Sequence, residues 1–210
     1  MKHRLLISAV LAYQFFPSAG YTQKIVAECT IEYTIEPDTS FHFNKAAGFS
    51  GSKRIYIKGN DARMDIESSG YLQSVIYDKS QHQAVVLRVL GTNKFITRLQ
   101  NADWISENRR FDSLKINYQS ATKTLIGYEC KSAMITLTDG TEYQLYYTTS
   151  IAPSVREYDH VFKDIPGFVL FYQVKQSNHL VKYTATRISF SPVPASKFDI
   201  PVSGYRILEK

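Results

Sequence analysis

The sequence has few of the residues that define disulfide-rich domains, metal sites or low-complexity chains. Its 210 residues include 2 cysteines, 5 histidines, 10 glycines and 7 prolines. Two cysteines permit at most one intramolecular disulfide, which excludes a disulfide-rich scaffold. The glycine and proline content is ordinary, as in a folded domain. A chain of this length buries a sufficient core without staples, so the composition predicts one globular domain.

Charge is also scarce and dispersed. Charged residues make up 21% of the chain, and the formal net charge is +6, of which Lys2 and Arg4 supply two and leave +4 for the rest. The basic clusters are short, as at residues 53–54 and 109–110. Nucleic-acid-binding proteins concentrate basic charge on one stripe or helix. The charge pattern therefore predicts a solvated surface and no nucleic-acid partner, and it leaves open a weak preference for anionic lipid or glycan surfaces.

Catalytic and metal-binding motifs are missing as well. The chain contains no HExxH, no GxSxG and no phosphate-binding glycine loop. Asp159 and His160 are adjacent, but adjacency in sequence is not the geometry of a catalytic triad, and Glu32 and Glu36 share the wet face of a strand. The histidines that follow the N-terminal segment lack metal-ligand spacing: His42, His82, His160 and His179. We therefore predict no catalytic residue, metal or cofactor, and no enzyme.

The N-terminal segment has the three parts of an export signal. Residues 1–4 are basic, residues 5–16 are apolar but too short to span a bilayer, and Ser18 and Gly20 are small. The pattern predicts a signal peptide over residues 1–20, against the alternative of a buried N-terminal helix, and a single β-rich domain over residues 21–210. Glu28 before Cys29 argues against a lipid-modified cysteine. We expect an exported protein of the periplasm or the exterior, with association with the outer membrane left open.

The body of the chain alternates with the period of β-strands. Apolar and polar residues alternate over residues 25–36, which predicts one long strand with a dry and a wet face. Strands over residues 54–66, 72–90 and 94–99 are joined by short turns, which indicates an antiparallel meander. The apolar phase shifts after Met134, which suggests a bulge or a sharp twist. Further strands are expected to about residue 190, and residues 198–205 are expected to pack across a sheet edge.

Three connections break this pattern. Residues 37–52 form a predicted loop or lid, whose Phe41, Phe43 and Phe49 either cover the core or line an opening. Residues 101–114 predict a short helix or irregular turn that plugs one end of the sheet. Residues 152–163 are polar, with a possible helical turn near 158–162, and Pro166–Gly167 ends them.

These elements predict a mainly β fold. We expect about ten antiparallel strands in a single strongly curved sheet or open β-barrel, with one or two short helices, because sheets of this width rarely stay flat. A curved sheet has a concave face that must be filled by side chains, a helix or a ligand.

The two cysteines both fall on apolar faces of predicted strands. A disulfide between Cys29 and Cys130 is the one possible intramolecular bridge, and it would stabilise by about 3–5 kcal/mol in the chain-entropy model. Two buried free thiols are the alternative. The sequence is compatible with both.

The motifs at residues 126–130 and 165–167 resemble those of secreted bacterial proteins of the GLPGLI-motif family and related domains of unknown function from the Bacteroidota. The shared outline is a GYxC strand at residues 127–130, a tyrosine-containing strand at 146–149 and a Pro-Gly turn into the strand at 165–170. Asp164 and Phe168 stand where the motif has Gly and Leu. The resemblance implies a fold similar to Lol-type carriers, in which a curved sheet wraps an apolar cavity, and it carries over no site residue.

Three functions compete at this point. The first is an envelope protein that binds a lipid or other apolar ligand in the concave face, and the second is an interaction module with a filled core and a protein or glycan partner. The third, an enzyme, would need a cleft with converging polar groups. We rank them in that order.

Overall fold

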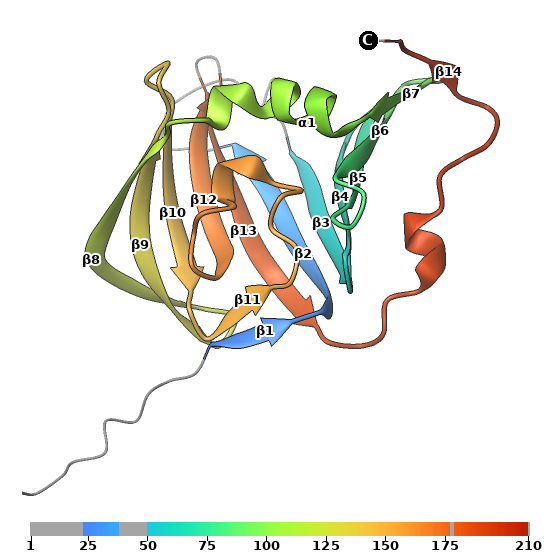
Figure 1. Cartoon of the computed structure of the whole chain (residues 1–210). Coiled ribbons are helices and arrows are strands. Elements are labelled where there is room, and N and C mark those ends of the chain that lie inside the picture. Colours follow the sequence, from blue (N-terminus) through green and yellow to red (C-terminus); the bar gives the residue numbers. More distant parts are fainter. Residues whose placement is uncertain (1–22, 38–49, 177–178, 210) are drawn as a thin grey trace, which may run out of the picture.

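The computed structural model describes residues 23–37, 50–176 and 179–209. It contains a 12-stranded sheet and a separate two-stranded sheet (Figure 1). The elements in chain order are β1 Lys24–Val26, β2 Glu28–Pro37, β3 Gly51–Lys58, β4 Asp61–Ser68, β5 Tyr71–Asp78, β6 Gln83–Leu90, β7 Asn93–Leu99, α1 Asn101–Asn108, η1 Arg109–Phe111, β8 Lys115–Leu125, β9 Tyr128–Thr136, β10 Glu142–Thr148, β11 Ile151–Pro153, η2 His160–Phe162, β12 Phe168–Gln176, β13 His179–Ser189, η3 Ala195–Phe198 and β14 Arg206–Ile207.

The large sheet joins two antiparallel meanders. Strands β2 to β7 follow one another in space, and so do β8, β9, β10, β12 and β13. The pairing of β2 with β13 connects the halves, and the sheet bends into an open barrel with β8 and β14 at its two edges. Helix α1 connects β7 to β8 and crosses the upper opening in Figure 1. The prediction of a strongly curved, unclosed sheet with short helices is confirmed.

The concave face follows from the register of the strands. Ile57, Ala62, Tyr77, Ala84 and Leu99 form one cross-strand row near α1. Directly opposite residues point to the same face of a sheet. The next row contains Ile55, Met64, Val75, Val86 and Thr97, and the third contains Lys53, Ile66, Gln73, Arg88 and Phe95. The first row is therefore apolar, the second is apolar except for Thr97, and the third is polar at Lys53, Gln73 and Arg88.

The segment between β11 and β12 lies inside the curve of the sheet (Figure 1). We call residues 154–167 the plug. Val155 and Ile165 are fully buried, and Tyr158 and Val161 are nearly so. The plug is tied to the barrel wall by backbone and side-chain bonds, for example from Ser154 Oγ to the carbonyl of Gly59 at 2.8 Å. The segment that the sequence predicted to be a polar connection therefore enters the barrel and fills part of its concave side.

The turn that ends the plug requires glycine. Gly167 has φ +152°, and a Cβ added there would overlap the carbonyl oxygen of Thr148. Glycine alone tolerates both the backbone angle and the close approach. This explains the predicted Pro-Gly turn in physical terms.

The C-terminal segment covers the outside of the barrel. Phe198, Ile200 and Tyr205 pack on a cluster formed by Ile76, Val85, Leu87 and Ile96 on the outer face of β5 to β7. Strand β14 then pairs parallel with β7. The tail thus covers both an outer face and one sheet edge, where the sequence predicted only an edge.

Two strand predictions differ from the structure. The single strand over residues 25–36 is broken at Ala27, because the Ala27 carbonyl accepts a bond from Gly59 N–H at 2.7 Å and β1 leaves the sheet to pair parallel with β11. As a result Ile25 is 58% exposed and Val26 is buried. A bulge or a sharp twist was predicted after Met134, and the bulge is absent from the β9–β10 ladder, whose register is unbroken. Register shifts lie instead in β8 between Tyr118 and Thr122, and between β10 and β12.

Several predictions fall outside the described residues. These are the signal peptide over residues 1–20 and the aromatic loop with Phe41, Phe43 and Phe49. Among the described residues, no helix is long and apolar enough to cross a membrane.

The two cysteines are buried free thiols in the structure, so of the two alternatives the disulfide is not formed. Cys29 lies in β2 and Cys130 in β9, with β13, β12 and β10 between them in the sheet. Burial raises the pKa of Cys29 to about 12 and that of Cys130 to about 11.

Candidate functional site

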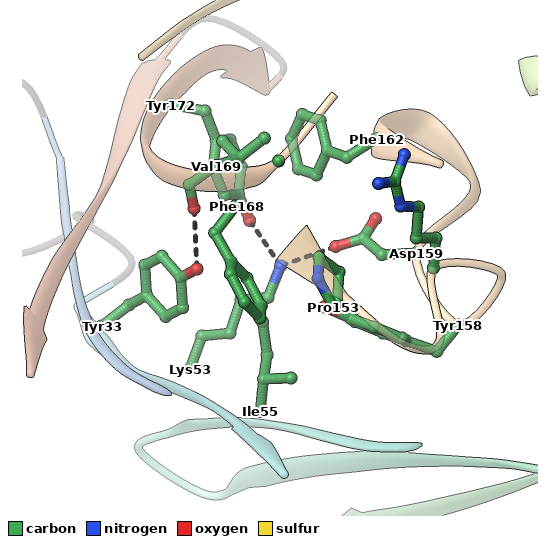
Figure 2. A pocket seen from close by; sticks show the side chains of 12 residues that line it. Tyr33, Lys53, Ile55, Pro153, Tyr158, Asp159, Phe162, Phe168, Val169 and Tyr172 are labelled. Atoms are coloured by element: carbon green, nitrogen blue, oxygen red, sulfur yellow. Dashed lines mark hydrogen bonds and ion pairs between the residues drawn. The ribbon is translucent and has the colours of Figure 1, made fainter. Parts of the chain in front are cut away.

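A buried ion pair joins the plug to the barrel wall (Figure 2). Lys53 Nζ lies 2.8 Å from Asp159 Oδ2, with side-chain exposures of 3% and 16%. Lys53 also donates to the hydroxyl of Tyr172 at 3.2 Å. A buried charge requires this kind of pairing because its dehydration is costly.

Aromatic rings complete the surroundings of the lysine. Its Nζ lies 5.0 Å from the ring centroid of Tyr172, 5.7 Å from that of Tyr33 and 5.8 Å from that of Phe162. The rings attract the ammonium group through their negative faces. Burial acts to lower the pKa of Lys53, but the charge of the Asp159 carboxylate and its hydrogen bond to the ammonium group outweigh this effect and leave the pKa raised. Lys53 therefore stays protonated at neutral pH.

The neighbouring tyrosines stay neutral. Tyr33 donates to the carbonyl of Val169 at 2.8 Å. Burial raises the pKa of Tyr33, and it raises that of Tyr158 and Tyr172 well above the ordinary value. The void between these side chains has a volume of about 30 Å³, the share of one water molecule in the liquid. This cluster therefore anchors the plug and has no room for a ligand.

A larger cavity lies beside the plug, between α1 and the inner face of β4 to β7. Its volume is about 440 Å³, within the range of about 300–1,000 Å³ that is usual for ligand pockets. Met64, Val75, Val86 and Leu99 form its apolar wall, and Trp104, Phe111 and Tyr158 line it from α1, η1 and the plug. This is the part of the concave face that the plug leaves unfilled.

One end of the cavity is polar. Gln73 and Arg88 face each other across the β5–β6 ladder. Arg88 Nε donates to Gln73 Oε1 at 3.0 Å, and the Tyr71 hydroxyl donates to the same oxygen at 2.9 Å. Because the Gln73 oxygen is held from two sides, it orients the guanidinium group of Arg88.

The other end is closed by Trp104 and His160. Their rings meet edge to face with centroids 5.3 Å apart, and Trp104 also packs on Tyr77 at 5.6 Å. Trp104 Nε1 and His160 Nδ1 are buried without a hydrogen-bond partner among the described residues. Burial lowers the pKa of His160, followed by the effect of Lys163, so the imidazole is neutral at pH 7.

The cavity was not predicted residue by residue. The sequence predicted a concave face and a short helix at one end of the sheet, and both line the cavity. It set Asp159 and His160 aside as an accidental pair, and the structure separates their roles, since Asp159 binds Lys53 whereas His160 packs on Trp104. Within residues 23–37, 50–176 and 179–209, no group of three His, Cys, Asp or Glu side chains is placed to hold a metal.

No protein-family model matches the chain, and no curated protein matches it. Solved structures do match. A structure of PNGF-II has a TM-score of 0.50 at 16% identity, over 87% of this chain and 31% of that one. The chain thus spans about a third of the length of PNGF-II, and at this identity the similarity concerns the fold alone.

Two further structures are more distant. The complex of MucA and MucB from Pseudomonas aeruginosa has a TM-score of 0.37 at 12% identity, over 83% of this chain and 56% of that one. A β-barrel-like protein of unknown function from Brucella abortus has a TM-score of 0.42 at 6% identity, over 80% and 99%. At these scores neither supports an inference about this protein.

Proposed function

We propose that this is an exported binding protein of the cell envelope, whose cavity takes an apolar or amphipathic ligand, and that it is a looser relative of the secreted GLPGLI-type proteins. Binding rather than catalysis is proposed because Met64, Val75, Val86 and Leu99 give the cavity an apolar wall, and because the buried ion pair serves to anchor the plug. The leader pattern of residues 1–20 supports export. The observation that carries the proposal is the cavity of about 440 Å³ that the plug leaves open in the concave face.

Native mass spectrometry of residues 21–210 from a periplasmic expression, with lipid analysis of the extract, tests the proposal. We expect a reproducible bound mass that is released as lipid or another apolar compound. Val86→Phe would reduce this bound fraction, because Val86 lines the cavity. Val89→Phe serves as the control, since Val89 lies on the same strand but on its opposite face. A bare mass that takes up no added fatty acid or phospholipid would refute the proposal.

A second candidate is an interaction module, which the edge of the sheet favours. In the described part of the chain, β8 pairs with β9 alone, and nearly all of its side chains are half-exposed or exposed. The opposite edge is covered by β14. Uncovered edge strands can accept a strand from another protein. A bare protein mass together with a protein complex that Tyr118→Asp abolishes would favour this function, because Tyr118 is 53% exposed on β8.

A further inference from the structure

The charges around the cavity differ in how strongly they act on its interior. Arg88 is half-buried in the wall itself. Glu107 on α1 and Glu209 in the tail also line the cavity, but both are exposed. Exposed charges are screened by water and salt, whereas a half-buried charge acts through a lower dielectric. Arg88 therefore has the strongest effect on a bound molecule.

The remaining ionisable groups at the cavity do not oppose Arg88. The Asp159 carboxylate is neutralised by Lys53 at 2.8 Å. His160 is neutral at pH 7, since burial lowers its pKa. The polar groups that complete the lining, Gln73, Thr97 and Asn108, carry no charge. The cavity interior thus presents one fixed positive group.

The position of Arg88 matches an amphipathic molecule. Along β6 the inner face presents Ala84, Val86 and then Arg88. Four residues of strand span about 13 Å, so an apolar stretch leads from the Trp104 end of the cavity to the guanidinium group. Arg88 Nε donates to Gln73, and within the described part of the chain the two terminal nitrogens have no hydrogen-bond partner, so they form a fork. Such a fork suits a carboxylate or a phosphate.

We propose that the cavity binds an amphipathic ligand with a hydrocarbon chain along Val75 and Val86 and an anionic head group at Arg88. This inference rests on the proposed binding function and specifies its ligand class. A fatty-acid carboxylate and a phospholipid phosphate share the required chemistry.

Four dodecyl compounds with different head groups test the inference on the intact mature chain, below their micelle concentrations. These are dodecanoate, dodecyl phosphate, the neutral glycerol ester of dodecanoic acid and dodecyltrimethylammonium. Trp104 is the one tryptophan of the sequence and lines the cavity, so its fluorescence reports binding, with calorimetry as a second measurement. We expect the two anions to bind at least about tenfold more tightly than the neutral ester, as charge-assisted hydrogen bonds imply. The ratio of the dissociation constants of dodecanoate and dodecyl phosphate shows whether the site prefers a fatty-acid carboxylate or a phospholipid phosphate.

Arg88→Gln is expected to remove the preference for anions while leaving the affinity for the neutral ester within about twofold. Arg98→Gln is the matched control, because Arg98 is exposed on the outer face of the neighbouring strand β7. Arg88→Lys keeps the positive charge but loses the paired guanidinium nitrogens, and it is expected to retain part of the preference for anionic head groups. If Arg88→Gln does not fold, the reduced preference of Arg88→Lys tests the inference in its place. Equal binding of all four head groups, or a preference that survives Arg88→Gln, would overturn the inference and leave the binding function intact. If none of the four binds, both proposals fail.

Discussion

The buried pair of Lys53 and Asp159 gives the sharpest test of how the plug is held. At 2.8 Å the attraction between the two charges is about 6 kcal/mol for an effective dielectric constant of about 20. The dehydration of both ions costs several kcal/mol each. The pair as a whole therefore contributes little net stability, but removal of one partner leaves the other buried without a counter-charge.

We expect Asp159→Asn to lower the free energy of unfolding by about 3 kcal/mol, at the lower end of the range for broken buried pairs. The lower end applies because the Tyr172 hydroxyl and three aromatic rings still contact the Lys53 ammonium group. Lys53→Met should cost less, about 2 kcal/mol, because the Asp159 side chain is 16% exposed and can recover water. The double variant should be more stable than the sum of the single changes predicts, by at least about 1 kcal/mol.

Equilibrium unfolding in urea, followed by circular dichroism and by Trp104 fluorescence, measures the free energy of unfolding of the wild type, the two single variants and the double variant. The control is the pair of Lys163 and Asp164, which is as short at 2.7 Å but has side-chain exposures of 34% and 56%. Its removal should change the free energy of unfolding by at most about 1 kcal/mol. Additive effects at Lys53 and Asp159, or a loss below about 1 kcal/mol for Asp159→Asn, would refute the conclusion that this pair anchors the plug.

Three other outcomes follow from burial and backbone geometry. The free energy of unfolding should fall above about pH 10. The raised pKa values of Tyr33, Tyr158 and Tyr172 keep these tyrosines protonated in the folded state, whereas the unfolded chain releases their protons. Each tyrosine that is protonated when folded and ionised when unfolded lowers the free energy of unfolding by about 1.4 kcal/mol per pH unit. Lys53 acts in the same direction, since its raised pKa gives a contribution that is complete below its unfolded pKa and is lost as the pH rises through the folded value. A flat profile of unfolding free energy from about pH 8 to 11 would contradict this. Gly167→Ala should destabilise by about 3 kcal/mol in a urea titration, against about 1 kcal/mol for Gly70→Ala, whose φ is also positive but whose Cβ would meet open space. Cys29 and Cys130 should resist thiol reagents in the folded protein and both react in denaturant without reductant, which intact mass counts; failure to label under those conditions would mean that they are paired.

The meander was predictable because its signals are local. Alternation of apolar residues and short turns identified β3 to β7, and the Pro-Gly turn identified the start of β12. The pairing of β2 with β13 brings together residues about 150 positions apart, and no local pattern encodes which distant strands become neighbours. The break at Ala27 was missed for a similar reason, since it depends on a hydrogen bond from Gly59.

The burial of the plug is indicated by a residue elsewhere in the chain and not by the sequence of the plug itself. Residues 154–164 look like a surface connection, because polar residues predominate among them. In β3, however, Lys53 shares the inward phase of Ile55 and Ile57, and a lysine on a dry face requires a buried counter-charge. That requirement predicts an acidic residue inside the barrel, hence a segment of chain that enters it. Asp159 meets it from the middle of the plug, so a lysine that interrupts an otherwise apolar strand face indicates that another part of the chain fills the concave side.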